Sequence, residues 1–218
     1  MDDSRLPREE LHRALRGLAL LNRWSRADAT LWREIARLRV SKLTLLDVAT
    51  GSADVPLRLW ETAAREGVHL DITGCDRNGD AGAVARSAAR HLGASFVFEQ
   101  RDVRSGLPDG TFDIVTCSLF LHHLQTPEAR VLLQGLAEKA RRLVLVSDLL
   151  RSRRGELLAF AAPRALCRSA VVHHDAVQSV RNAFSFTELQ ELTSDAGLEH
   201  ARLVPVWPCR ALISWTPQ

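Results

Sequence analysis

The chain has 218 residues, of which 46% are hydrophobic and 25% are charged. This length and composition suit one globular α/β domain with a helical extension, and they exclude an intrinsically disordered chain. No stretch approaches the roughly 20 uncharged apolar residues that a membrane-spanning helix needs, so we expect no stable membrane insertion. The formal net charge of +3 is too small to indicate a nucleic-acid partner.

The N-terminus and the cysteines predict a cytoplasmic protein. The chain opens with MDDS, which is acidic and lacks the basic region and apolar run of a signal peptide. Its cysteines lie far apart, without the paired spacing of a metal site, and three of them stand in apolar or strand-like surroundings. We therefore expect buried free thiols in a reducing compartment. The four cysteines are Cys75, Cys117, Cys167 and Cys209.

The first forty residues are predicted to be helical. From Leu11 onward, leucines recur there at intervals of three and four residues, which places them on one face of a helix, and Ala27 to Leu38 continues the pattern around Trp32. We expect residues 1–40 to form a helical extension that lies against a sheet or over a pocket. The leucines of this face are Leu6, Leu11, Leu15, Leu18 and Leu21.

From residue 41 onward, short apolar runs alternate with longer helical patterns. The runs are apolar on both faces, and this alternation predicts a parallel sheet covered by helices on both sides. The predicted strands are Leu43–Ala49, Leu70–Cys75, Ser95–Glu99, Phe112–Ser118 and Leu143–Ser147. The predicted helices between them are Ala53–Arg65, Ala81–Leu92 and Pro127–Arg141.

The pattern is weaker after residue 148. Arg151–Leu166 is compatible with a helix, whereas Cys167–Asn182 has little periodicity, and we interpret residues 149–183 as a lid-like insertion. Ser185 then opens a further helix, in which Ser185 and Glu188 have the spacing of a capping box. The end of the chain predicts an antiparallel hairpin at the sheet edge, with strands Arg202–Val206 and Ala211–Trp215.

The loop after the first predicted strand suits a nucleotide-like ligand. Residues 45–56 read LLDVATGSADVP, so Asp47 stands at the end of a buried strand before small residues lead into a helix. Folds of this kind bind nucleotides beyond the carboxyl ends of parallel strands, and small residues let the loop backbone approach the ligand. Asp47 and Asp54 would repel the phosphates of a dinucleotide, but they suit a ligand with a sulfonium and an ammonium group.

This loop resembles the first motif of class I S-adenosylmethionine-dependent methyltransferases, in which an acid precedes Gly-x-Gly-x-Gly. Only the central glycine, Gly51, is present, because Ala49 and Ala53 occupy the outer positions. Alanine is small, but Ala49 is awkward if the backbone there needs a positive φ. The alanines leave two interpretations open: a working cofactor loop, or a non-catalytic scaffold or binding protein on the same fold.

Three later segments resemble further motifs of the family, in the same order and spacing. Asp76 ends the second strand, where the family's acid binds both ribose hydroxyls; Asp102 follows the third strand, where an acid binds the adenine amino group. Residues 112–124, FDIVTCSLFLHHL, match the fourth-strand motif. The resemblance implies S-adenosylmethionine as cofactor, bound by Asp47, Ala49, Thr50, Gly51, Asp76, Arg77, Asp102, Val103 and Ser118.

The resemblance also implies the overall architecture. We expect a Rossmann-like α/β fold with a seven-stranded, mostly parallel sheet over residues 41–218. Within the family, the chain is most similar to bacterial small-molecule enzymes, namely quinone-biosynthesis C-methyltransferases and the O-methyltransferases found alongside type III polyketide synthases. The segments VHHD at 172–175, SVR at 179–181 and FSFTEL at 184–189 extend this similarity into the C-terminal part.

Histidines are the candidate catalytic residues. His174 beside Asp175 fits a general base with an orienting carboxylate, in the segment expected to cover the acceptor. His122 and His123 compete for this role, because the fourth-strand motif fixes them near the cofactor. Adjacent histidines rarely bind one metal ion, and no third ligand stands at a familiar spacing, so we expect no metal. The candidate acceptor-binding residues are His122, His173 and Arg181.

Apolar residues in the insertion predict an aromatic or lipid-like small-molecule acceptor. We therefore predict O-methylation of a phenolic hydroxyl, as expected of an enzyme of secondary metabolism. C-methylation of a quinone precursor and N-methylation remain alternatives. RNA methylation is disfavoured, because Ser118–Leu121 stands where such enzymes have an Asn/Asp-Pro-Pro-aromatic tetrad.

Overall fold

The structure is a computed structural model that describes residues 8–166 and 170–217. Its centre is a seven-stranded sheet with the order β3-β2-β1-β4-β5-β7-β6. The strands β1 to β5 pair in parallel, and β7 pairs antiparallel with both β5 and β6. This confirms the predicted Rossmann-like fold with its C-terminal antiparallel hairpin. The strands are β1 (Lys42–Val48), β2 (His69–Asp76), β3 (Phe96–Gln100), β4 (Phe112–Ser118), β5 (Ala140–Leu149), β6 (Arg202–Val206) and β7 (Arg210–Trp215).

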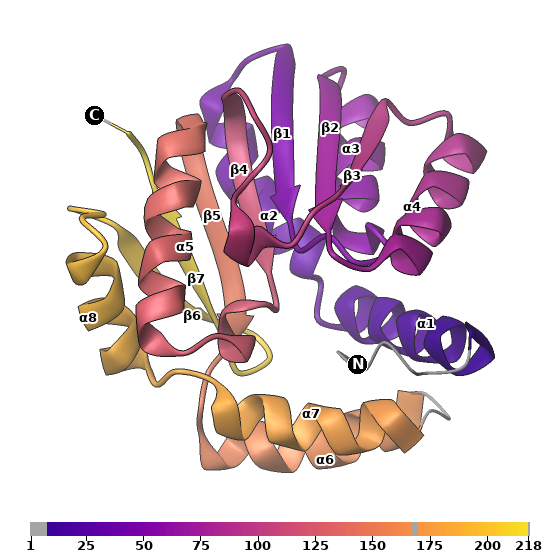
Figure 1. The fold of residues 1–218 in the computed structure, drawn as a ribbon, viewed down its shortest axis with the longest axis vertical. Helices are drawn as coiled ribbons and strands as arrows, with labels where there is room; N and C mark the ends of the chain where they lie inside the picture. The colour runs from indigo at the N-terminus through magenta and orange to yellow at the C-terminus, as the bar shows by residue number, and fades with distance from the viewer. Residues whose placement is uncertain (1–7, 167–169, 218) are drawn as a thin grey trace.

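Helices cover both faces of the sheet (Figure 1). The helices α2 (Ala27–Ile35), α3 (Asp54–Arg65) and α4 (Gly79–Leu92) lie on one face, and α5 (Thr126–Lys139) and α8 (Phe186–Asp195) on the other. Successive residues of β1 therefore enter different cores. Leu45 packs in the cluster beneath α2 and α3, whereas Leu46 packs in the cluster beneath α5 and α8. Short 3-10 turns follow α2, β3 and β4, at Ala36–Leu38, Val103–Ser105 and Leu121–His123.

The helix starts and ends follow from their caps. The Asn78 side chain accepts hydrogen bonds from the backbone amides of the first turn of α4, so Asn78 is the cap of this helix. Ser185 and Glu188 form the predicted capping box of α8. Helix α5 ends at Lys139, slightly before the predicted end, because Ala140 already has extended backbone and begins β5.

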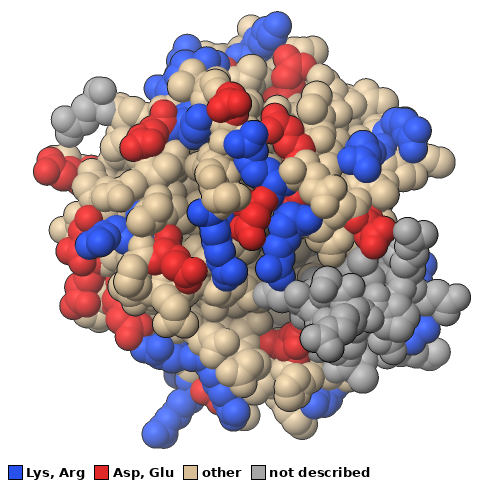
Figure 2. Space-filling model, in the orientation of Figure 1, with Lys and Arg blue, Asp and Glu red and all other residues tan. Residues whose placement is uncertain are grey.

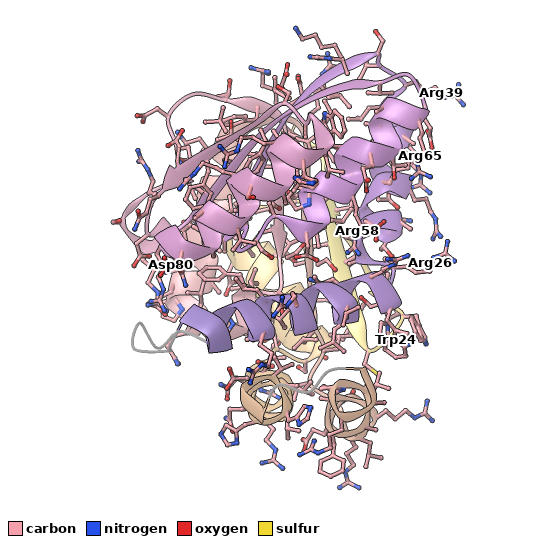
Figure 3. The ribbon with its side chains drawn as sticks, turned by 90° about the vertical axis from the view of Figure 1, so that its right-hand side faces the viewer. Trp24, Arg26, Arg39, Arg58, Arg65 and Asp80 are labelled. Atoms are coloured by element: carbon pink, nitrogen blue, oxygen red, sulfur yellow. The ribbon has the colours of Figure 1, made fainter. Side chains whose placement is uncertain are left out.

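Three helices lie beyond the carboxyl ends of the parallel strands. They are α1 (Arg8–Trp24), α6 (Arg153–Leu166) and α7 (Ala170–Asn182); α6 and α7 run side by side, seen end-on below α1 in Figure 3. Helix α7 was not predicted, because Cys167–Asn182 has little periodicity. The side chains of Val172 and Val180 in α7 are buried. Other residues on the inner side of α7 border a cavity, and a helix that borders a cavity does not need a continuous apolar stripe.

The N-terminal segment has two different environments. In α2, Leu31, Trp32 and Ile35 are buried against the sheet, whereas α1 lies over the cavity. Trp24 at the end of α1 contacts Trp207 in the turn between β6 and β7, with ring centroids 4.5 Å apart (Figure 3). The division of the chain at residue 40 and the insertion at 149–183 remain predictions.

Three of the four cysteines lie in the described residues, as free thiols. Cys75 and Cys117 are buried in strands, where burial raises the pKa of Cys75 to about 12, and Cys209 is half-buried. Leu6 and Cys167 lie outside the described residues.

On the face drawn in Figure 2, acidic and basic side chains are interspersed. No helix in the described part of the chain is long and apolar enough to cross a bilayer.

Candidate active site

A cavity of about 980 Å³ lies between the carboxyl ends of the parallel strands and the helices α1, α6 and α7. Its volume is at the upper end of the usual range for ligand pockets, so it has room for a cofactor and a small acceptor together. Every residue that the sequence assigned to the cofactor borders this cavity. They are Asp47, Ala49, Thr50, Gly51, Asp76, Arg77, Asp102, Val103 and Ser118.

The loop between β1 and α3 has left-handed backbone at alternate positions. The φ angles are 57° at Ala49, 55° at Gly51 and 57° at Ala53. These are the three positions at which the family motif has glycine, the residue that adopts this conformation without steric cost. The loop therefore keeps the backbone shape of the motif, although two alanines must adopt a conformation that costs an L-residue about 1–2 kcal/mol each.

Asp76 joins the loops that follow β1 and β2. One of its carboxylate oxygens, Oδ2, accepts a hydrogen bond of 2.8 Å from the Gly51 amide, and Oδ1 accepts one of 2.8 Å from the Asn78 amide. Each carboxylate oxygen has a second acceptor position. Because Asp76 also borders the cavity, it can accept two further hydrogen bonds from a pair of neighbouring hydroxyls, such as those of a ribose.

Asp47 is a buried acid at the centre of the cavity wall. Only 3% of its surface is exposed, and its Oδ1 accepts a 2.6 Å hydrogen bond from Thr116 Oγ1. Burial raises the pKa of Asp47 to about 6, and the nearby charges of Asp54 and Asp76 add to this effect. A cation in the cavity would relieve the cost of ionising Asp47.

The hydroxyl of Ser118 in the cavity wall is buried, and among the described residues its Oγ has no hydrogen-bond partner. Buried polar atoms in native proteins are normally satisfied, so this hydroxyl indicates that a polar ligand completes the site. The Thr50 hydroxyl in the same wall interacts with the Asp47 carboxylate and opposes the rise in its pKa. Toward β3, the exposed Asp102 and the half-buried Val103 form the rim, where Asp102 Oδ1 accepts a 3.0 Å hydrogen bond from the Arg104 amide.

His122 and Asp148 form a buried pair on the other side of the cavity. His122 follows β4 and Asp148 lies near the end of β5, so the neighbouring strands bring Nδ1 and Oδ1 to 2.6 Å. Asp148 Oδ2 accepts hydrogen bonds from the amides of Phe120 and Leu121. Burial alone would raise the pKa of Asp148, but His122 and the backbone amides bring it below its ordinary value.

The ionisation state of Asp148 determines which ring nitrogen of His122 can accept a proton. An ionised carboxylate only accepts hydrogen bonds, so the proton on the His122 ring is held on Nδ1. Nε2 of the neutral ring then carries the lone pair. His122 borders the cavity, with the ring of His123 4.2 Å away. Sequence reasoning missed Asp148, although an acid ending a strand next to the histidine motif was an available signal.

The other predicted catalytic and acceptor-binding residues are placed differently. His174 is exposed and is not among the described residues that border the cavity, whereas Asp175 does border it. Successive helical residues point about 100° apart, so the structure does not bring this pair together as a dyad facing the cavity. His173 Nε2 lies 3.2 Å from the Pro163 carbonyl oxygen, and Arg181 pairs with a glutamate of α6 at the surface. These positions do not support the predicted acceptor contacts of His173 and Arg181.

A polar chain connects α1, α3 and β7 at the cavity wall. Asn22 of α1 donates a 3.1 Å hydrogen bond to Asp54 and accepts one of 3.0 Å from Arg210. Arg58 lies 3.4 Å from the same Asp54 oxygen, between α3 and α1 in Figure 3. Sequence reasoning missed Asn22 and Arg210. In the described ranges, no group of three or more His, Cys, Asp or Glu side chains has the arrangement of a metal site.

Comparisons with known proteins agree with this geometry. Residues 45–142 match the family model described as "Methyltransferase domain". No curated protein sequence matches the chain significantly.

Similar solved structures share the fold at low sequence identity. One is magnesium protoporphyrin IX methyltransferase (ChlM) from Synechocystis PCC 6803 with bound SAH, with a TM-score of 0.67, 16% identity, and coverage of 92% of this chain and 86% of that one. A SAM-dependent methyltransferase from Aquifex aeolicus has a TM-score of 0.59, 17% identity, and coverage of 85% and 88%. An O-methyltransferase family 2 protein from Planctomyces limnophilus DSM 3776 in complex with apigenin has a TM-score of 0.59 and 18% identity; 80% of this chain spans 49% of that one.

The family match covers the strands and loops that form the cofactor side of the cavity, from β1 to the start of β5. The structural matches extend over most of the chain. Residues 45–142 are therefore a methyltransferase domain, and the chain has the fold of the class I S-adenosylmethionine-dependent methyltransferases.

Proposed function

We propose that this protein methylates a hydroxyl group of a small aromatic molecule, with S-adenosylmethionine as methyl donor and His122 as general base. The observation that carries the proposal is the His122–Asp148 pair, which places an oriented imidazole in the wall of the cavity that the cofactor residues border. This proposal replaces His174 by His122 as the base and Asp175 by Asp148 as the residue that orients it.

The cofactor residues fit S-adenosylmethionine, which supplies an activated methyl group when bound. Asp76 would accept hydrogen bonds from the ribose hydroxyls, and Asp102, at the rim of the cavity, would bind the adenine amino group, as the family resemblance implies. Asp47 would supply negative charge to the cationic end of the cofactor, while Ser118 offers a buried hydroxyl without another partner in the described structure. These residues would hold the donor in place, which is most of what an in-line methyl transfer needs from a protein.

His122 would supply the base that deprotonates the acceptor, which alignment of the reactants alone does not provide. A phenol has a pKa of about 10, so near neutral pH it is mostly protonated and a weak nucleophile. His122 Nε2 can accept the phenol proton, while Asp148 holds the opposite edge of the ring and stabilises the imidazolium that results. Positioned bases of this kind typically accelerate a reaction by about 10²–10⁴-fold.

The part of the cavity near this pair is suited to an aromatic acceptor. Apolar side chains of α6, α7 and the end of β5 face it, among them Leu149, Leu158 and Val172. An apolar wall with a few placed polar groups is the usual composition of small-molecule sites. One structural neighbour is named an O-methyltransferase, which favours oxygen over carbon or nitrogen as the acceptor atom.

Two measurements test the proposed function. Calorimetric titration of S-adenosylmethionine and S-adenosylhomocysteine (SAH) into the protein tests cofactor binding, which a non-catalytic scaffold with an obstructed loop would lack. A screen of phenols, quinols and aromatic amines with methyl-labelled cofactor then identifies the acceptor atom. Transfer to phenols that depends on His122 supports the proposal, whereas transfer only to carbon or nitrogen contradicts it.

A further inference from the structure

Arg210 is a buried cation in the wall of the cavity. It is the first residue of β7, pairs in the sheet with Leu149 of β5, and has only 6% of its surface exposed. Its guanidinium reaches Asn22 on α1, where Nη2 donates a 3.0 Å hydrogen bond to Asn22 Oδ1. The proposed function gives this residue no role.

The guanidinium is poorly satisfied for a buried charge. An arginine side chain has five N–H donors, yet among the described residues Nη1 has no hydrogen-bond partner and no carboxylate lies within ion-pair distance. Burial lowers the pKa of Arg210 to about 10. Isolated buried charges are costly, so proteins normally pair them with a group of opposite sign.

The two acids whose charges act on Arg210 are already bonded to other groups. Asp54 accepts a hydrogen bond from Asn22 and pairs with Arg58, and Asp148 is bonded to His122 and to backbone amides. Both stabilise the positive charge of Arg210 from a distance. A direct anionic partner for Arg210 would have to come from the contents of the cavity.

We propose that Arg210 binds the carboxylate of a molecule held in this cavity. The planar, forked guanidinium matches a carboxylate better than it matches a neutral oxygen, and it is the usual partner for one in buried sites. The inference rests on the proposed function, because the carboxylate belongs either to the aminoacyl end of the cofactor or to an aromatic carboxylic acid that serves as acceptor. In both cases Asn22 connects the bound carboxylate to α1, which covers the cavity.

Paired ligands that differ only in the carboxylate test this proposal. For the cofactor, the pair is SAH and its decarboxylated counterpart, each titrated calorimetrically. For the acceptor, the pair is 4-hydroxybenzoate and 4-hydroxybenzamide, each titrated into protein saturated with SAH. Both pairs are measured with the wild type, with Arg210→Gln, and with Arg210→Lys, which keeps the charge but not the fork. Arg202→Gln is the matched control, since the exposed Arg202 pairs with the buried Glu34 and is not among the residues that border the cavity.

In the wild type and in Arg202→Gln, we expect the carboxylate member of one pair to bind at least about tenfold more tightly than its partner. In Arg210→Gln this preference should fall below about threefold, and Arg210→Lys should lie between the two. The pair that shows the effect identifies the source of the carboxylate. Each preference is the ratio of two dissociation constants measured on the same protein. A modest loss of folding stability in a variant affects both constants equally, so it does not change the ratio.

Two results overturn the proposal. One is the absence of a carboxylate preference in both pairs with the wild type, and the other is a preference that persists unchanged in Arg210→Gln. Failure of the wild type to bind SAH or its decarboxylated counterpart is a different result: it contradicts the proposed function itself, and the role of Arg210, which depends on that function, falls with it.

Discussion

Nδ1 of His122 lies 2.6 Å from Oδ1 of Asp148, with 6% of the histidine and 4% of the aspartate exposed to solvent. The two residues are 26 positions apart in the chain and meet because β4 and β5 are adjacent parallel strands. In contrast, His174 and Asp175 are sequence neighbours that a helix directs apart. We therefore expect the base at the carboxyl ends of β4 and β5 and not on the covering helix α7.

The first prediction is that His122→Gln lowers kcat for a phenolic acceptor by about 10²-fold or more near neutral pH. The loss should shrink as the pH approaches the pKa of the phenol, about 10, because the acceptor then ionises without help. Initial rates across this pH range, with the phenol found in the screen, measure both effects. Thermal unfolding of the variant checks that the fold is intact.

His174→Ala is the matched control, because this histidine is exposed on α7. It should leave kcat and its pH dependence within about twofold of the wild type. An equal loss at all pH values in His122→Gln would indicate that His122 positions the acceptor and is not its base. A large loss in His174→Ala would restore the role to the covering helix.

The second prediction concerns the cofactor anchor. Asp76→Ala should weaken SAH binding by about 1.5–3 kcal/mol, because charge-assisted hydrogen bonds to the ribose are lost. Calorimetric titration measures this change directly. Asp71→Ala is the control, since Asp71 lies on the same strand but bonds to His69 and Ser95 at the surface. Unchanged affinity in a folded Asp76→Ala protein would refute the ribose assignment.

Much of the fold was predictable from the sequence because the parallel strands are short, have apolar cores and are bounded by small or polar residues. The cofactor residues were predictable for a related reason: each lies at or just beyond the carboxyl end of a strand, and strand order determines where such residues gather. Asp148, Asn22 and Arg210 were not recognised, because their roles depend on distant partners; Asn22 and Arg210 are 188 residues apart. Helix α7 was missed because its inner side borders a cavity and so has no regular apolar stripe.

The third prediction is a pH dependence of cofactor binding set by Asp47. Its pKa of about 6 lies above the ordinary value of 3.8, so the carboxyl is substantially protonated below pH 6. The cationic cofactor favours the ionised form, so affinity should rise with pH through about 6 and level off above about 7. Below the pKa, the loss approaches about tenfold per pH unit. Titrations of S-adenosylmethionine between about pH 5 and 8 measure this dependence.

Asp47→Asn isolates this contribution from other titrating groups. The variant should bind S-adenosylmethionine more weakly near neutral pH, and its affinity should vary less between pH 5 and 7 than that of the wild type. An identical pH profile in the two proteins would exclude Asp47 as the group responsible.

The same pKa shift predicts an effect of Asp47 on stability. A folded-state pKa above the unfolded value means that the folded protein binds more protons between about pH 4 and 6, so this residue lowers the free energy of unfolding as pH rises through that window. The ionised, buried Asp47 therefore destabilises the cofactor-free protein near neutral pH. Asp47→Asn should raise the melting temperature at neutral pH and lose this advantage near pH 4. A variant that melts below the wild type at neutral pH would contradict the assigned shift.

The last prediction concerns the alanines of the cofactor loop. Ala49 has a φ of 57°, which costs an L-residue about 1–2 kcal/mol, whereas glycine adopts it freely. Glycine also loses about 0.4–1 kcal/mol more conformational entropy on folding. The difference leaves Ala49→Gly about 0.5–1 kcal/mol more stable than the wild type. Chemical denaturation of the cofactor-free protein measures this change, and SAH affinity should stay within about tenfold.

Ala83→Gly is a control for which we expect a change in the free energy of unfolding of the opposite sign. Ala83 is exposed within α4, where glycine costs helix stability, so this variant should be about 0.5–1 kcal/mol less stable than the wild type. Opposite signs in the two variants would assign the strain to the backbone of the loop and not to a general effect of glycine. If Ala49→Gly is destabilised like Ala83→Gly, the left-handed conformation at Ala49 is refuted. If instead it gains far more than tenfold in SAH affinity, the natural loop obstructs the cofactor, and the non-catalytic scaffold becomes the better interpretation of the chain.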